Sequence, residues 1–244
     1  MTPEEQALVV EPRFRAVLLD WRGTLVVAPT YPWLAERALR GLGRDASAAA
    51  VESVLERLRA ADPSRVDSSA IDADVDEHRA AYREWFAAAG VDDELSAALY
   101  AVESDPSLNP FAVDVGDLLR TLTASGVRVG VVSDIHVDLR PVFAAHEAGD
   151  GRTWADLVDV WALSYEVGAA KPDPAIFRSA LDRLDLAPHD VLMVGDRGGW
   201  DGAAAAIGIT TLVLPPLTSV AEARLHRVLD LVLPGRSRTG GSGA

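Results

Sequence analysis

Cysteine is absent from the 244-residue sequence, which excludes disulfide bonds, thiolate metal ligands and a cysteine nucleophile. Long apolar runs are absent too, since no segment approaches the roughly 18 apolar residues that a membrane-spanning helix needs. The first residues, MTPEEQ, are acidic and lack the apolar stretch of a secretory signal peptide. These absences predict a cytoplasmic protein that has no membrane partner.

Basic residues are scarce relative to acidic ones. The chain has 23 lysines and arginines against 37 aspartates and glutamates, which gives a formal net charge of −14 and an isoelectric point near 4.7. Such a surface repels nucleic acids and anionic lipids, although a small local basic site can still bind an anion. We therefore expect no nucleic-acid partner. The sequence leaves open whether the protein is a monomer or a homodimer.

Hydrophobic residues make up 49% of the chain, and several form short runs that end at a turn signal. The first run, at residues 15–19, is typical of a strand buried on both faces of a parallel sheet. Strands and helices that alternate along the chain predict an α/β fold with a Rossmann-like, mostly parallel sheet flanked by helices. The other predicted strands are 127–132, 158–163, 191–194, 210–214 and an edge strand at 230–233. The predicted helices are 114–124, 138–147, 173–186, 201–206 and 219–229.

Residues 31–109 have a different character, with helical periodicity and almost no strand signal. Apolar residues at helical spacing predict four helices, near 34–42, 51–58, 76–89 and 93–102. We therefore predict a helical domain at 29–109, inserted into an α/β core that comprises residues 1–28 and 110–234. Residues 1–14 are expected to be a loose lead-in, and the Gly- and Ser-rich tail at 235–244 to be disordered.

Polar side chains suited to phosphate or metal binding follow the predicted strands. Asp20, Ser133 and Asp196 come at strand ends, Asp201 follows five residues after Asp196, and Lys171 precedes a helix. The carboxyl ends of parallel strands share one edge of the sheet, so these groups can converge there. Clustered carboxylates without cysteine suit Mg²⁺. Taken singly, each acid or serine could instead cap a turn or helix, and the lysine could be a solvated surface residue.

The order and spacing of these residues resemble the four motifs of the haloacid dehalogenase superfamily. The set comprises Asp20 with Gly23-Thr24-Leu25, then Ser133, Lys171-Pro172, and Gly195-Asp196 with Asp201, and it covers most of residues 15–233. The helical insertion after the first motif is similar to the C1 cap of that superfamily. The resemblance implies that the 29–109 domain closes over Asp20 and supplies specificity. Its aromatic and basic candidates are Tyr31, Trp33, Arg37, Arg79, Tyr82, Arg83 and Trp85.

The resemblance also implies a role for each motif residue. Asp20 would be the nucleophile that takes up a phosphoryl group as an aspartyl-phosphate. Mg²⁺ would be held by Asp20, the backbone carbonyl of Arg22 and Asp196, with Asp201 in an outer position. Ser133 and Lys171 would bind the transferring phosphoryl group, and the metal and lysine would neutralise its charge.

Arg22 departs from the pattern, because phosphatases of this superfamily have a second aspartate at that position. That aspartate protonates the leaving group and then activates water, which a guanidinium cannot do. Loss of a positioned acid or base typically costs about 10²–10⁴-fold in rate. We expect the Arg22 side chain to point toward the leaving group of the substrate; the alternative is that it turns away and pairs with an acid. His78 and His136 are candidate replacements, although nothing in the sequence aims them at Asp20.

The sequence thus predicts a Mg²⁺-dependent hydrolase that acts on a small phosphorylated or otherwise anionic metabolite. Two alternatives stay open. One is a binding protein that kept the fold and a phosphate site without turnover. The other is a metal-independent haloacid dehalogenase: that branch also lacks the second aspartate, and Trp200-Asp201 resembles its fourth motif, whereas Gly195-Asp196 resembles the Mg²⁺-binding form.

Overall fold

A five-stranded parallel sheet lies at the centre of the computed structural model, which describes residues 11–235. The strand order is β5-β2-β1-β6-β7, so the first strand lies in the middle of the sheet. All neighbouring strands pair in parallel. The predicted Rossmann-like sheet is confirmed, and its strands are β1 (Ala16–Leu19), β2 (Arg128–Ser133), β5 (Val160–Leu163), β6 (Val191–Gly195) and β7 (Thr210–Val213).

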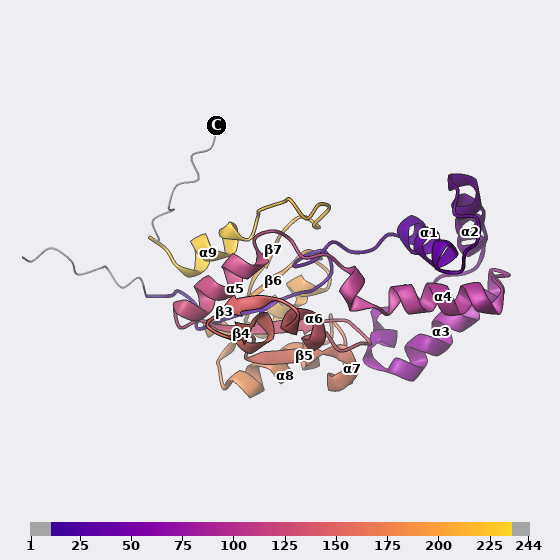
Figure 1. The fold of residues 1–244 in the computed structure, drawn as a ribbon. Coiled ribbons are helices and arrows are strands. Elements are labelled where there is room, and N and C mark those ends of the chain that lie inside the picture. Colours follow the sequence, from indigo (N-terminus) through magenta and orange to yellow (C-terminus); the bar gives the residue numbers. More distant parts are fainter. Residues whose placement is uncertain (1–10, 236–244) are drawn as a thin grey trace, which may run out of the picture.

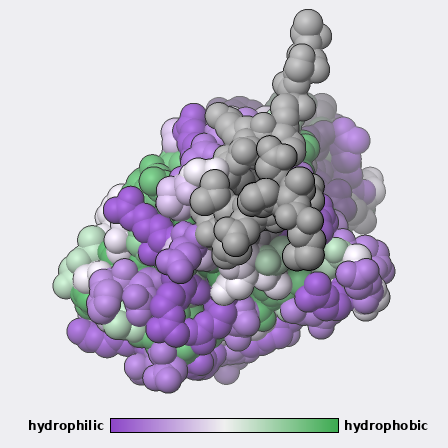
Figure 2. All heavy atoms as spheres, turned by 90° about the vertical axis from the view of Figure 1, so that its left-hand side faces the viewer, coloured by the Kyte–Doolittle hydropathy of each residue, from purple (hydrophilic) through white to green (hydrophobic). Residues whose placement is uncertain are grey.

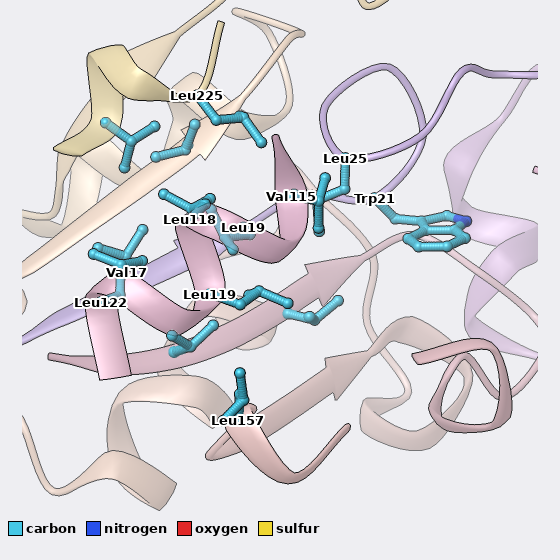
Figure 3. Packing of buried hydrophobic residues seen from close by; sticks show 14 of the residues in the cluster. Val17, Leu19, Trp21, Leu25, Val115, Leu118, Leu119, Leu122, Leu157 and Leu225 are labelled. Carbon is cyan, nitrogen blue, oxygen red and sulfur yellow. The ribbon is translucent and has the colours of Figure 1, made fainter. Parts of the chain in front are cut away.

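Helices cover both faces of this sheet because alternate residues of β1 point to opposite sides. Val17 and Leu19 belong to one apolar cluster with α5 (Val115–Ala124) and α9 (His226–Val232), as Figure 3 shows for several of these side chains. Ala16 and Leu18 belong to another cluster with α8 (Pro174–Leu184) and the 3₁₀ helix η5 (Asp201–Ile207). The shorter elements are α6 (Arg140–Ala144), α7 (Ser164–Val167), η3 (Trp154–Leu157) and η4 (Pro188–Asp190).

Residues 31–109 form the predicted inserted helices and contain no strand. They stand to one side of the sheet (Figure 1) and have an apolar cluster of their own. We call this group the helical module, and its limits as an independent domain remain a prediction. Its elements are α1 (Tyr31–Gly41), α2 (Ala48–Ala60), η1 (Ser69–Ala73), α3 (Val75–Ala88), α4 (Asp93–Glu103) and η2 (Pro106–Leu108).

Side-chain caps fix where several of these helices begin. The carboxylate of Asp74 accepts hydrogen bonds from the backbone N–H groups of Asp76 and Glu77 at the start of α3. Asp173 caps α8 in the same way, and Pro174 occupies the first helical position. Both arrangements satisfy backbone donors that have no partner inside the helix.

The carboxyl-terminal end of the sheet differs from our prediction. The edge strand expected at 230–233 is wrong, because residues 226–232 form α9 instead. Val228, Leu229 and Val232 recur at helical spacing and pack against α5 in the core. A short apolar run fits either periodicity, and packing against a helix decided the outcome here.

The segment between β2 and β5 also differs from our prediction. The helix expected at 138–147 is shorter, and a small antiparallel hairpin of β3 (Glu147–Gly149) and β4 (Arg152–Thr153) follows it. The predicted lead-in at 1–14 and tail at 235–244 lie largely outside the described residues.

On the face of the molecule away from the helical module, hydrophilic residues predominate and hydrophobic ones are scattered among them (Figure 2). Among residues 11–235, no helix combines the length and the apolar character that crossing a bilayer requires.

Candidate active site

The carboxyl ends of the central strands bring the predicted site residues together. Asp20 follows β1, Ser133 ends β2 and Asp196 follows β6, while Lys171 lies in the loop before α8. Asp20, Ser133 and Lys171 line a cavity of about 270 Å³ between the sheet edge and η1 of the helical module, whereas Asp196 is not among its lining residues. The cavity is lined by Asp20, Arg22, Asp72, Ser133, Asp134, Lys171 and Arg197, with residues 66–69.

Lys171 links two of the predicted acids. Its Nζ donates to Asp20 Oδ1 at 2.5 Å and to Asp201 Oδ1 at 2.7 Å. The other oxygen of Asp20 accepts from the hydroxyl of Thr24 at 3.0 Å. Lys171 is only 3% exposed and Asp20 only 6% exposed, so the reading of Lys171 as a solvated surface residue is wrong. These bonds hold the Asp20 carboxylate in a fixed orientation at the cavity wall.

Asp201 is buried and positions the loop after β6. Its Oδ2 accepts hydrogen bonds from the backbone N–H groups of Asp196 at 3.1 Å and Arg197 at 2.8 Å. Its Oδ1 accepts a hydrogen bond from the Lys171 ammonium. A Cβ on Gly195 would overlap this carboxylate, so the close approach requires glycine. Asp201 thus orients the lysine and the loop rather than facing a ligand directly.

Asp196 offers a buried carboxylate oxygen that suits a cation. Oxygens of Asp20, Asp196 and Asp201 lie within 4.8 Å of one another. Asp196 Oδ1 is buried and has no hydrogen-bond partner among the described residues. Gly23 lies against this carboxylate at a positive φ of 80°, where any Cβ would clash with it. An unpartnered buried carboxylate beside a second one fits a hard divalent cation such as Mg²⁺.

Crowding of acids shifts the pKa values around the cavity. Burial, followed by the charges of Asp20 and Asp201, raises the pKa of Asp196 to about 6. Burial also raises the pKa of Asp20, and Lys171 acts in the opposite direction. Burial alone would lower the pKa of Lys171, but the carboxylates of Asp20, Asp134 and Asp201 raise it above its usual value. The lysine is therefore a permanent cation, and the remaining repulsion among the acids favours a bound cation.

Arg22 turns toward the helical module. Its Nη1 donates to Glu103 Oε1 at 2.8 Å, its Nη2 to the backbone carbonyl of Glu103 at 2.8 Å, and its Nε to Asn109 Oδ1 at 2.9 Å. Arg22 is also one of the residues that line the cavity. This differs from our expectation that Arg22 points toward the leaving group, because the guanidinium pairs with an acid of the helical module instead.

Several cavity residues were not singled out from the sequence. Asp134 Oδ1 accepts the backbone N–H of Lys171 at 2.7 Å and so ties the loop before α8 to the end of β2. Asp72 reaches the cavity from η1, and Arg197 stacks on Trp200 with its guanidinium carbon 3.7 Å from the ring centre. Asp72 carried no local signal because it joins the site only through the packing of the helical module.

For Lys171 a further signal was available, because it is the only lysine in the sequence. A chain that otherwise uses arginine for its basic side chains has kept one compact ammonium at the site. Lysine fits here as a point charge with three donors, whereas a planar guanidinium would not fit between Asp20 and Asp201 in the same way.

Solved structures of dehalogenases and phosphatases share this fold. A dehalogenase has a TM-score of 0.61 at 20% identity, covering 90% of this chain and 97% of that one. A 2-haloacid dehalogenase from Pseudomonas syringae pv. Tomato DC3000 has a TM-score of 0.57 at 21% identity, covering 88% and 98%. A HAD phosphatase from Thermococcus onnurineus has a TM-score of 0.56 at 22% identity, covering 90% and 99%. At such identities the likeness extends to the fold alone.

No curated protein matches the sequence. The family model for haloacid dehalogenase-like hydrolases matches residues 14–208, a span that contains every predicted motif residue from Asp20 to Asp201 as well as the helical module. The chain therefore belongs to the haloacid dehalogenase-like hydrolases.

Proposed function

We propose that this hydrolase is a Mg²⁺-dependent phosphatase that acts on a small phosphorylated metabolite through Asp20. The observation that carries the proposal is the buried, unpartnered Oδ1 of Asp196 close to the Asp20 carboxylate. A metal-independent enzyme would gain nothing from this arrangement, since an unpaired buried carboxylate is costly. A cation held by Asp20, Asp196 and the backbone carbonyl of Arg22 would offset that cost.

The bound Mg²⁺ would supply positive charge for the phosphoryl oxygens. Residues of the chain would carry out the nucleophilic attack and stabilise the transferring group. One Asp20 oxygen attacks phosphorus, and the bond to the leaving oxygen breaks with its electron pair remaining on that oxygen. Lys171 stabilises the charge on the transferring group, and the Ser133 hydroxyl donates to one of its oxygens. Water then attacks phosphorus and releases phosphate and free Asp20.

With Arg22 in place of the second aspartate, this cycle has no general acid at that position. A guanidinium cannot give a proton to the leaving oxygen, so the enzyme would favour substrates whose leaving group needs none. Acyl and aryl phosphates are such substrates. Their leaving groups are stable as anions, and general acid catalysis contributes less to their hydrolysis.

A specific observation also supports a second candidate, a haloacid dehalogenase. Arg22 replaces the acid that phosphatases use, and Arg22 and Arg197 both line the cavity. Two guanidinium groups beside a nucleophilic carboxylate would suit the carboxylate of a 2-haloacid. In that reaction Asp20 would displace halide from carbon, and water would hydrolyse the resulting ester.

One assay distinguishes these proposals. The full chain is incubated with p-nitrophenyl phosphate, acetyl phosphate or 2-chloropropionate, with Mg²⁺ or with a chelator, and released phosphate and chloride are measured. We expect phosphate release that requires Mg²⁺, and no chloride. Chloride release in chelator would identify a dehalogenase, and neither product would favour the binding protein.

The nucleophile is tested in the same assay. We expect Asp20→Asn to lose activity by on the order of 10³-fold or more, as removal of a catalytic nucleophile can cost up to about 10⁶-fold. The matched control is Asp182→Asn, at an exposed position on α8. Activity within a few-fold of wild type would remove Asp20 from this role.

A further inference from the structure

Two buried histidines and an aspartate meet where the helical module contacts the sheet. His78 comes from α3 and Asp72 from η1, while His136 lies in the loop after β2. The histidines are 2% and 3% exposed. Asp72 Oδ1 lies 3.6 Å from His78 Nε2 and 3.9 Å from His136 Nδ1. Three potential ligand atoms, from parts of the chain far apart in sequence, therefore face one another.

The hydrogen bonds of the two rings leave these inner nitrogens free to bind a ligand. His78 Nδ1 lies 3.1 Å from the Tyr100 hydroxyl, and His136 Nε2 lies 2.9 Å from the Ser104 hydroxyl. His136 Nδ1 has no hydrogen-bond partner among the described residues although it is buried. Outer partners of this kind orient metal-binding histidines, because they hold the proton on the nitrogen away from the metal.

The charge state of the rings also matches that of metal ligands. Burial lowers the pKa of His78 to about 3 and that of His136 to about 4. Burial thus favours the neutral imidazole, which is the form that coordinates metal. Glu103 Oε2 lies 3.9 Å from His78 Nε2 and 3.5 Å from His136 Nε2, while its Oε1 accepts from Arg22.

We propose that Asp72, His78 and His136 form a binding site for a divalent transition-metal ion such as Zn²⁺. Two imidazoles and one carboxylate, with a position left open, are a donor set that zinc accepts. This site is distinct from the Asp20–Asp196 site, whose ligands are all oxygens, and it does not depend on the proposed phosphatase activity. Asp72 also lines the cavity, so an ion that it holds would lie close to the candidate active site.

The distances need only a small adjustment. Tetrahedral ligands at about 2.0–2.1 Å from zinc are separated by about 3.3 Å, compared with the observed 3.6 Å and 3.9 Å. The two rings are stacked, with centres 3.4 Å apart and planes 15° apart, so their nitrogen lone pairs lie in two nearly parallel planes. The rings must tilt apart for both nitrogens to reach one ion, and this tilt is an observable consequence of binding.

The test uses the full chain after treatment with a chelator. Zn²⁺ binding is measured by calorimetry, and Co²⁺ is used as a coloured substitute whose visible absorption reports tetrahedral geometry. We expect Asp72→Asn, His78→Gln and His136→Gln each to weaken binding at least about tenfold, as loss of one ligand or its support does. His189→Gln, with 81% of the side chain exposed, is the matched control and should bind as wild type.

Two further measurements distinguish the proposed site from the Asp20–Asp196 site and from a variant that fails to fold. Asp196→Asn should retain the cobalt absorption, because its site is separate; loss of the absorption only in Asp196→Asn would place the metal at Asp20 and overturn the proposal. Proton–nitrogen correlation spectra of the wild-type histidine rings need no variant to fold. Zn²⁺ should shift Nε2 of His78 and Nδ1 of His136, and unchanged signals at saturating Zn²⁺ would also overturn it.

Discussion

Arg22 and Glu103 form a partly buried ion pair at the junction between the sheet and the helical module. The guanidinium of Arg22 donates to the carboxylate and to the backbone carbonyl of Glu103, both at 2.8 Å. The side chain of Glu103 is only 6% exposed, whereas that of Arg22 is 27% exposed. Glu103 ends α4, so Arg22 holds the end of the last long helix of the module against the loop that carries Asp20.

This pair leads to a stability prediction. Arg22→Met should lower the free energy of unfolding by about 2–3 kcal/mol, because it leaves Glu103 buried without its cation. The expectation is below the usual 3–5 kcal/mol for a buried pair because Arg22 is partly exposed. In a double-mutant cycle with Glu103→Gln, measured by urea unfolding, we expect a coupling of about 1–2 kcal/mol. Strictly additive effects would mean that the pair contributes no stability.

Because position 22 contacts Glu103, an acid engineered at position 22 would have a negatively charged neighbour. Arg22→Asp alone would place a carboxylate beside Glu103, and the repulsion would raise its pKa and displace it. Arg22→Asp combined with Glu103→Gln removes this conflict. We expect the double variant to hydrolyse alkyl phosphates faster, within the roughly 10²–10⁴-fold that a positioned acid contributes.

The measurement is a series of phosphate esters with leaving groups of different pKa. The wild type should show a steep dependence on leaving-group pKa, and the double variant a shallower one. Glu103→Gln alone is the control. Equal slopes in all three proteins would mean that position 22 does not face the leaving group.

Mg²⁺ should stabilise the protein through Asp196. A ligand that binds only the native state adds about 2.7 kcal/mol at 100 times its Kd, and the melting temperature should rise with Mg²⁺ concentration. Asp196→Asn should remove most of this rise, while Asp182→Asn should keep it. If calorimetric titration of Asp196→Asn matched that of wild type, Asp196 would not be a ligand.

Asp72 should make the metal-free protein less stable as the pH rises. Burial, with the nearby charges of Asp134 and Glu103, raises the pKa of Asp72 to about 7 from its ordinary value of 3.8. Between these values the native state binds a proton that the unfolded state has released, so the free energy of unfolding falls as pH increases through this range.

Asp72→Asn should therefore flatten part of the slope between about pH 4 and pH 7. The measurement is urea unfolding in chelator at several pH values. Asp67→Asn, an exposed position before η1, serves as the control. The same slope in Asp72→Asn and wild type would show that Asp72 is ionised in the native protein throughout this range.

The sheet and the motif residues could be predicted because their signals are local. The apolar runs before Asp20 and Asp196 can be satisfied only by burial on both faces, and in a parallel sheet their ends must share one edge. Helical periodicity likewise identified α1 to α4 from residues close in sequence. The run at 230–233 was misassigned because four apolar residues fit a strand as well as a helix.

The sequence by itself therefore determined the class of fold, the edge of the sheet that carries the candidate site and three of the acids near it, Asp20, Asp196 and Asp201. Only the tertiary structure decided which partners these residues have. Arg22 meets Glu103, which lies 81 positions later in the sequence, and His78 stacks on His136 from another part of the chain. Such pairings depend on how the helical module packs on the sheet, and packing is a property of the whole chain that no local pattern encodes.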